Sequence, residues 1–204
     1  MSNSCRVLTV MTIDRGADSA AAERMRRAAI DAFAESGYGG SSTRQIAKRL
    51  NMSATAMYPH YRSKEELLYA IALEGHGSLL AALKGADAPA ASFTHRLRAV
   101  VAAFASWHAE NHKQARVVQY ELHGLTPAHY RRIAPLRHQV TDVITEIVAG
   151  GVAAGEFHVD TVDEVVMAIS SLCVDVCRWF PSKQHRDAHK LGEVYARVAE
   201  RLVS

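Results

Sequence analysis

Apolar residues recur at helical spacing along nearly the whole chain, and this periodicity limits the possible folds more than any other feature. No run of alternating apolar and polar residues persists, so the pattern of an amphipathic strand is missing. Only five prolines occur in 204 residues, which leaves long stretches free to form helices. A chain of this length can bury a sizeable core in one large or two small domains. We therefore predict an all-α protein.

Caps and turns divide the first third of the chain into short helices. Gly37 can adopt the left-handed conformation that ends a helix, and the Gly-Gly-Ser-Ser turn at 39–42 follows it. Thr43 can then cap a second helix and Ser53 a third, because each hydroxyl can accept a hydrogen bond from a free N–H group of the first turn. These signals predict helices over 19–36, 44–50 and 54–60.

A fourth helix should begin after Ser63 and continue to about residue 83. Glu66 stands three residues after Ser63, so the two side chains can form a capping box. The segment 85–89, Gly-Ala-Asp-Ala-Pro, is the best candidate for a domain boundary. Beyond it the apolar pattern predicts five more helices, near 91–110, 112–124, 127–150, 161–180 and 184–203.

Positive charge is concentrated in the first third of the chain. Residues 19–84 carry nine Lys and Arg against six Asp and Glu, whereas residues 85–204 carry thirteen of each. Residues 41–64 hold five cations and no carboxylate, and they coincide with the two short helices and the turn that joins them. A purely cationic pair of short helices is typical of a unit that places a helix against DNA.

Small and polar side chains of this segment fit a DNA contact. Ala54 and Thr55 keep the first turn of the third helix narrow enough to approach base edges, and Thr55 can read a base through its hydroxyl or touch a thymine methyl group. Ser42 and Thr43 open the second helix, where free N–H groups and the helix dipole favour an anion. The other expected contacts, to phosphate or to a groove edge, are Arg44, Tyr58, His60 and Lys64.

Structural roles remain open for some of these side chains. Tyr58 can belong partly to the core, and Tyr61 is expected to pack inward. His60 can be a buried, hydrogen-bonded histidine instead of a phosphate contact. Lys48 and Arg49 are typical of a solvated face and would then supply only a background positive field.

Residues 20–70 resemble the N-terminal domain of TetR-type transcriptional repressors. The resemblance is carried by Thr-Arg-Gln-Ile-Ala at 43–47, Asn-Met-Ser at 51–53, Met-Tyr-Pro-His-Tyr at 57–61 and Ser-Lys-Glu-Glu-Leu at 63–67. Three departures are mild: Asn51 stands where glycine is common, Tyr61 replaces the usual Phe, and Pro59 lies inside the Tyr-x-His step.

The resemblance implies a division of labour along the chain. Residues 19–84 would form a helix-turn-helix DNA-binding domain with the fourth helix as its connector, and residues 85–204 a helical effector-binding and dimerisation domain. A homodimer would repress transcription at a palindromic operator, and an effector would move the fourth helix and change the separation of the two recognition helices. We expect residues 1–18 to be a mostly disordered N-terminal tail, and we expect the protein in the cytoplasm.

A weaker resemblance in the second half concerns the effector. Gly-Val-Ala-Ala-Gly-Glu-Phe at 151–157, before Asp160, and Arg-Trp-Phe-Pro at 178–181 are similar to one branch of TetR-type regulators, whose members often respond to fatty acyl-CoA or other CoA thioesters. Aromatic and polar side chains of this half can line a mostly apolar pocket. The predicted ligand-binding residues are Phe104, Trp107, Tyr120, His123, Arg178 and Trp179, with Val118, Leu122 and His108 as further lining. The alternative is that they only form a helical core.

The last two predicted helices are strongly amphipathic. Val162, Val165, Ile169, Leu172 and Val176 recur at helical spacing on one, and Leu191, Val194, Tyr195, Val198 and Leu202 on the other. Ordinary core packing is one interpretation. The other, which we favour because a DNA reader usually needs two copies, is a homodimer interface built from these two helices.

Other functional classes have less support. His108 and His112, like Cys173 and Cys177, stand four residues apart on one helical face, so a metal- or redox-responsive regulator is an alternative. A helical enzyme is less favoured, because the chain has no Gly-x-Ser-x-Gly elbow, phosphate loop or His-Glu-x-x-His motif. A DNA-binding module without ligand is a third alternative. We predict no catalytic site, no cofactor, no bound metal and no membrane partner.

Overall fold

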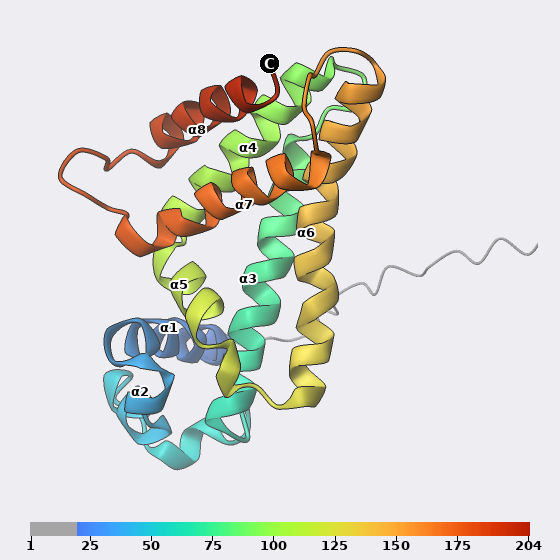
Figure 1. Ribbon diagram of the computed structural model, residues 1–204. Coiled ribbons are helices and arrows are strands. Elements are labelled where there is room, and N and C mark those ends of the chain that lie inside the picture. Colours follow the sequence, from blue (N-terminus) through green and yellow to red (C-terminus); the bar gives the residue numbers. More distant parts are fainter. Residues whose placement is uncertain (1–19) are drawn as a thin grey trace, which may run out of the picture.

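The computed structural model describes residues 20–204, and every regular element in this part of the chain is helical (Figure 1). The predicted all-α class is confirmed, while the predicted tail over 1–18 lies outside the described residues. No helix within 20–204 is long and apolar enough to cross a membrane. The elements are α1 (Ala20–Gly40), α2 (Thr43–Arg49), the 3-10 turn η1 (Ala54–Met57), α3 (Lys64–Ala86), α4 (Phe93–Glu110), α5 (His112–Tyr120), the 3-10 turn η2 (Leu122–Gly124), α6 (Pro127–Ala153), α7 (Val162–Trp179) and α8 (Ala188–Leu202).

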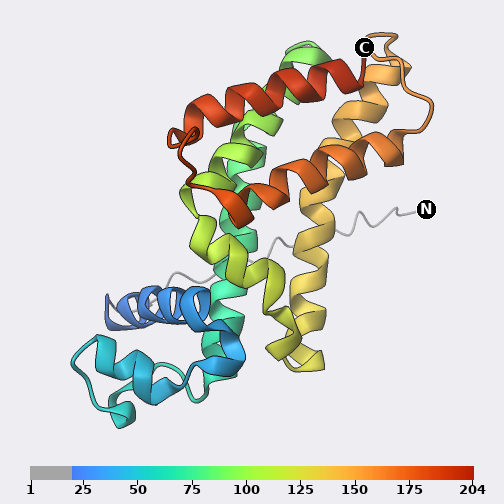
Figure 2. The same cartoon turned by 60° about the vertical axis from the view of Figure 1, so that its left-hand side comes forward.

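Two hydrophobic cores share α6, through Ile133 in one and Val140 in the other, and they also share α3. The first half of α3, with Leu67 and Ile71, packs with α1, α2 and η1 and also meets α5 and the start of α6. Its second half, with Leu79 and Leu83, packs with α4, α6 and α7. Figures 1 and 2 show α3 and α6 side by side, with α1 and α2 at one end of the molecule and α7 and α8 toward the other. The predicted boundary at 84/85 therefore falls in the last turn of a helix that belongs to both cores.

The start of α2 differs by one residue from the prediction. Ser42, not Thr43, is the N-cap: its hydroxyl accepts a hydrogen bond from the N–H of Gln45 at 3.2 Å, and Gln45 Oε1 accepts one from the Ser42 N–H at 2.8 Å. The two residues thus form a reciprocal capping box. Gly37 has the expected positive φ of 72°, although helical turns resume beyond it as far as Gly40.

The predicted third helix over 54–60 is shorter and tighter in the structure. Only Ala54–Met57 is regular, as a 3-10 turn whose N-cap is Ser53 as predicted. Pro59 has no N–H group to continue the ladder, which accounts for the early end. In the turn between α2 and η1, Asn51 has a positive φ of 54°. Asparagine tolerates this conformation better than most residues other than glycine. Asn51 can therefore stand where glycine is common.

At the start of α3 the predicted capping box is only half formed. The Ser63 hydroxyl accepts a hydrogen bond from the Glu66 N–H at 3.0 Å, as expected. Glu66 Oε2, however, accepts from the N–H of Arg62, at 2.7 Å, one residue before the cap. The carboxylate thereby ties the loop after η1 to the first turn of α3.

Helix α8 lies against α4 at close range, in both views of the fold (Figures 1 and 2). Gly192 permits this approach, because a Cβ atom there would stand 2.3 Å from Ser106 Oγ and 2.6 Å from the carbonyl oxygen of Ala102. Backbone atoms of α4 cannot move aside as a flexible side chain can. The packing of α8 on α4 thus depends on a residue without a side chain.

We predict that Gly192→Ala lowers the free energy of unfolding, although alanine is the better helix former. The clash should cost about 1–3 kcal/mol, more than the ~1 kcal/mol of helix propensity gained. The matched control is Gly85→Ala in α3, where nothing lies within 4 Å of the added carbon. Thermal denaturation should show a lower melting temperature for Gly192→Ala and an equal or higher one for Gly85→Ala. An increase in both would contradict the close packing.

Candidate functional site

The candidate nucleic-acid interface is formed by α2, η1 and the start of α3, at the end of the molecule remote from α8 (Figure 1). Most of the predicted contacts are available there. Thr43, Ala54 and Lys64 are half-buried, whereas the exposed members are Ser42, Arg44, Thr55, Tyr58 and His60. The structure thus presents an exposed set of polar side chains on two adjoining short helices, which is the arrangement a helix-turn-helix unit uses.

The turn η1 orients Thr55 outward. The Thr55 hydroxyl lies 2.8 Å from the Ser53 hydroxyl. The Ser53 hydroxyl also caps η1, because it accepts a hydrogen bond from the Ala56 N–H at 3.3 Å. Tyr58, at the end of η1, is 54% exposed, so the alternative that it belongs to the core is wrong. Tyr61 packs inward as expected, with 9% of its surface exposed. Its hydroxyl accepts a hydrogen bond from Arg26 at 2.8 Å.

Lys64 has an internal role that the sequence did not reveal. Its Nζ donates to the carbonyl oxygens of Tyr38 at 2.7 Å and Ser41 at 2.8 Å, and it lies 4.1 Å from the centre of the Tyr38 ring. The ammonium has three hydrogens, so these two bonds leave one for a phosphate. Lys64 therefore fixes α3 against the turn between α1 and α2, and its predicted phosphate contact would be an additional role.

The acid-free character of 41–64 does not extend to its surroundings. Glu35 on α1 forms a two-pronged pair with Arg49 on α2, with one oxygen accepting from Arg49 Nη1 at 3.2 Å. The hydrogen bond from Arg49 holds the pKa of Glu35 below its usual range. The charge of Arg49 is thus compensated by a carboxylate on another helix. Arg44 and Lys48 remain exposed on α2.

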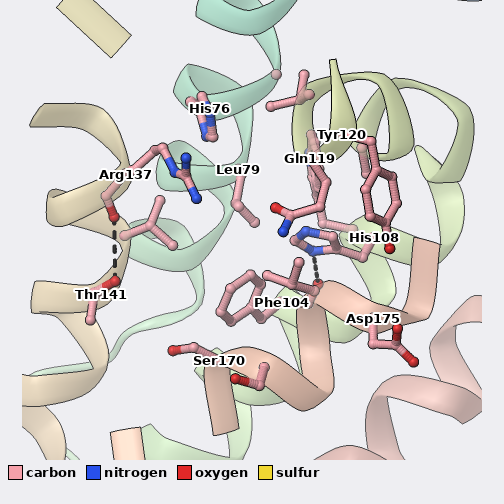
Figure 3. Close-up of a pocket in the computed structure, with 17 residues that line it drawn as sticks. His76, Leu79, Phe104, His108, Gln119, Tyr120, Arg137, Thr141, Ser170 and Asp175 are labelled. Carbon is pink, nitrogen blue, oxygen red and sulfur yellow. Dashed lines mark hydrogen bonds between the residues drawn. The ribbon is translucent and has the colours of Figure 1, made fainter. Parts of the chain in front are cut away.

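A second candidate site is a cavity of about 370 Å³ among five helices of the opposite half (Figure 3). Its volume lies within the ~300–1,000 Å³ typical of small-molecule sites. The lining residues are Gly75, His76 and Leu79 of α3; Phe104, Trp107 and His108 of α4; Ala115, Val118, Gln119 and Tyr120 of α5; Arg137, Val140 and Thr141 of α6; and Ser170, Ser171, Val174 and Asp175 of α7.

The cavity has an apolar floor and a polar rim. Phe104 and Leu79 are buried, whereas Gln119, Arg137 and Thr141 are exposed. Figure 3 shows side chains from facing helices directed toward one space, as expected for a site that encloses a ligand. Such a combination can hold an apolar body and orient it through a few hydrogen bonds.

Two histidines in the wall, the buried His108 and the half-buried His76, are neutral at physiological pH. Burial lowers the pKa of His76 to about 4, with the nearby Arg137 and His108 acting in the same direction. Burial also lowers the pKa of His108 to about 4, although its hydrogen bond to the Phe104 carbonyl opposes the shift. That bond, 3.0 Å from Nδ1, requires the proton on Nδ1 and leaves Nε2 of His108 as an acceptor.

The cavity contains three of the six predicted ligand-binding residues: Phe104, Trp107 and Tyr120. The other three do not reach it. His123 is exposed near the Tyr120 carbonyl, and Arg178 is exposed and paired with Asp175 at 2.7 and 2.9 Å. Trp179 packs with Phe180 and His185 beyond the end of α7. His123 follows the end of α5, and Arg178 and Trp179 are the last two residues of α7, so all three lie outside the lining of this cavity and their ligand contacts stay predictions.

Sequence reasoning missed the polar residues of the wall. His76 follows Ala72 by four residues and precedes Leu79 by three, so it interrupts the apolar stripe of α3. Ser170 similarly adjoins Ile169 on the inward face of α7. A polar residue inside an otherwise buried stripe was the available signal. Arg137, on the exposed side of α6, gave no such signal.

The metal- and redox-responsive alternative has little support in the structure. No group of three or more His, Cys, Asp or Glu within residues 20–204 could hold a metal ion. Cys173 and Cys177 are buried and unbonded. Burial raises the pKa of both thiols, that of Cys177 to about 11, so neither is a reactive thiolate near neutral pH.

Comparisons with known proteins agree with this geometry. The profile of "Bacterial regulatory proteins, tetR family" matches residues 26–71, and that of "Tetracyclin repressor-like, C-terminal domain" matches residues 90–203. A regulatory protein of the tetR family from Rhodococcus RHA1 is 48% identical, with a TM-score of 0.87 over 91% of this chain and 98% of its own.

Two further similar proteins come from Bacillus subtilis. The fatty acid metabolism regulator protein of Bacillus subtilis (strain 168) is 25% identical over 129 residues, which span 63% of this chain and 66% of that protein, slightly less than two thirds of its length. The structure of the transcriptional regulator FadR from Bacillus subtilis in complex with stearoyl-CoA is 21% identical, with a TM-score of 0.71 over 90% of this chain and all of that one. The latter likeness shows the shared fold.

We predict that Lys64→Ala lowers both stability and DNA affinity. Loss of two hydrogen bonds to backbone carbonyls should reduce the free energy of unfolding by about 1–3 kcal/mol. Loss of a phosphate contact should weaken binding on all sequences and flatten the salt dependence by about one unit. Thermal denaturation and DNA titrations at several salt concentrations would measure the two effects separately.

The matched control for Lys64→Ala is Lys48→Ala, which removes an exposed cation from the same domain. It should leave the melting temperature unchanged and alter the salt dependence less than Lys64→Ala. If Lys64→Ala lowers stability but keeps the full salt dependence, the lysine is structural only.

Proposed function

The chain belongs to the TetR family of bacterial regulatory proteins, and we propose that it is a transcriptional repressor that leaves its operator when a small hydrophobic effector fills the cavity. The observation that supports this proposal most directly concerns α3. This one helix packs in the core of the DNA-binding unit and also forms a wall of the cavity. A CoA thioester is the first effector class to test.

The proposal that the chain binds DNA is supported by the exposed polar side chains on and beside α2 and η1. Thr55 and Ala54 would read base edges, while Ser42, Thr43, Arg44, Tyr58 and His60 would contact the backbone of the duplex. Carboxylates are missing from residues 41–64, so nothing on these two short helices repels the phosphates. The match to the family profile covers this unit.

The effector half rests on the cavity and on the relatives. One relative regulates fatty acid metabolism, and one related structure contains stearoyl-CoA. In this chain the floor formed by Phe104, Leu79 and Val118 can cover an acyl group, while the exposed rim leaves an exit for the bulkier CoA moiety.

Three helices that line the cavity also make polar contacts with the DNA-binding unit or its connector. On α3, Lys64 holds the turn between α1 and α2. On α5, Lys113 pairs with Asp31 of α1 at 2.6 Å. On α6, the His129 ring lies 2.8 Å from Glu65 of α3 and is stacked on Tyr69. A ligand that shifts these helices would therefore move the recognition unit.

The dimer is proposed to form through α7 and α8. Among the described residues, these two helices carry large apolar side chains that are 38–65% exposed: Met167, Leu172, Val194, Val198 and Leu202. Such a face is typical of a subunit interface. A two-fold dimer would bind two half-sites about one DNA turn apart, ~34–36 Å between centres.

We predict that selection from a random pool of DNA duplexes enriches a palindrome, because a two-fold dimer reads the same sequence in both half-sites. Sedimentation of the complex should show an even number of chains. Adding a panel of CoA thioesters should then reduce the affinity for this palindrome by about 5–150-fold for the effective member. Binding that stays independent of sequence would contradict the repressor proposal, and release by metals alone would contradict the effector class.

We predict that Glu65→Ala weakens the coupling between the two sites without abolishing either. Glu65 Oε1 accepts a hydrogen bond from the Thr126 N–H at 2.8 Å, and its carboxylate contacts His129. Burial opposes ionisation, but these hydrogen bonds outweigh it and lower the pKa of Glu65. With the link removed, the effector should change DNA affinity about fivefold less, which corresponds to ~1 kcal/mol of coupling.

The matched control is Glu74→Ala, which removes a carboxylate of the same helix paired with Arg26 on α1 and leaves the contact to α6 intact. DNA titrations with and without the effective thioester would give the coupling for both variants. Equal coupling in Glu65→Ala and the unmodified chain would show that the signal takes another route.

A further inference from the structure

Two polar atoms in the wall of the cavity are buried without a hydrogen-bond partner among the described residues. They are Nε2 of His76 on α3 and Oγ of Ser170 on α7. Nearly all buried polar groups in proteins are paired, because an unpaired group forfeits its bonds to water. Both residues line one cavity, so an occupant of that cavity can supply the missing partners.

The two atoms are on different sides of the cavity. Figure 3 shows His76 on α3 and Ser170 on α7 at opposite sides, with Leu79 and Phe104 between them in this view. Arg137 extends from α6 into the same part of the cavity as His76. An occupant that satisfies both atoms therefore needs two separated polar groups on an apolar body.

Charge narrows the class of the occupant. Arg137 is the one Lys or Arg among the lining residues, and it lies beside neutral His76. Asp175 is the one carboxylate of the lining, and Arg178 already pairs with it. An anionic or carbonyl oxygen is thus favoured on the side of Arg137 and His76. A neutral hydroxyl or ketone oxygen suits Ser170, whose hydroxyl can both donate and accept.

Size sets a further limit. At ~30 Å³ for each water-sized group, a cavity of about 370 Å³ holds about a dozen non-hydrogen atoms. The acyl chain of stearoyl-CoA has about half as many again, so part of such a chain would lie outside this space. The enclosed part of the occupant is therefore compact.

We propose that the cavity binds a compact oxygenated acid of about a dozen non-hydrogen atoms, either free or as the acyl part of a CoA thioester. Its acid or thioester carbonyl faces Arg137 and His76, and a hydroxyl or ketone oxygen at its far end meets Ser170. This inference rests on the proposed function and specifies its effector. A saturated fatty acid or its thioester offers the carbonyl but no second oxygen, so it would leave the Ser170 hydroxyl unpaired and the cavity discriminates against it.

The test compares 4-hydroxycinnamate with 4-methylcinnamate, which differ only by a hydroxyl in place of a methyl group, and with decanoate as the saturated probe. Each compound is titrated into the protein by calorimetry, once as the free acid and once as the CoA thioester. The comparison shows which of the two forms the cavity binds. We expect the hydroxyl compound to bind about tenfold more tightly than the methyl compound, since a site built around hydrogen bonds rejects an analogue that lacks one. Equal or tighter binding of the methyl compound or of decanoate, in both forms, overturns the inference.

Two variants assign the contacts. Ser170→Ala should reduce the affinity for the hydroxyl compound to that for the methyl compound, whereas His76→Leu should weaken both equally, because they share the acid group. Neither variant should lower the melting temperature of the unligated protein, since each removes an unpaired buried group. The matched control is Ser78→Ala, an exposed serine of α3 outside the cavity, which should change nothing. A lower melting temperature with unchanged affinities would show that His76 and Ser170 are structural.

The outcomes separate this inference from the proposed function. If decanoyl-CoA binds and releases the operator while the hydroxyl compound does not bind, the function stands and the inference fails. If none of the compounds binds in either form, both the inference and the thioester-responsive function fail.

Discussion

The structure depends on the continuity of α3, because this helix contributes to both hydrophobic cores. Leu67 and Ile71 pack under the recognition unit, and two turns further on Leu79 packs in the core around the cavity. Gly75, between them, does not interrupt the helix; it is buried where a Cβ atom would meet Gln114 and Val118 of α5 at 3.3 Å. Its role is thus close packing on α5 within a helix that transmits displacement along its length.

Polar contacts attach the recognition unit to this helix at few points. In addition to the hydrophobic core below it, Lys64 bonds two carbonyls of the turn between α1 and α2, and Glu66 holds the loop after η1. A displacement of α3 would therefore change the position of the recognition unit through these bonds and through the shared core. Glu65 and His129 add the contact through which α6 can impose such a change.

The sequence predicted the elements better than the sites, for physical reasons. Helix limits follow from local signals such as Ser53 and Gly37, and these agreed with the structure to within a few residues. The cavity depends on which faces of five distant helices converge, so aromatic residues gave only a partial guide: Trp107 reached it, whereas Trp179 packed elsewhere. The pairing of Arg49 with Glu35 likewise joins two helices and leaves no trace in the local charge pattern.

Helix α7 contributes to two neighbouring surfaces between residues 167 and 172. Ser170 and Ser171 line the cavity, while Met167 and Leu172 belong to the partly exposed apolar face of α7 and α8. A substitution on α7 that adapts the cavity to a new compound therefore also disturbs residues available to a second subunit. Positions on α5 and α6, such as Gln119 and Thr141, are free of this conflict. Divergence of ligand preference among relatives should accordingly be concentrated on α5 and α6, with α7 changing more slowly.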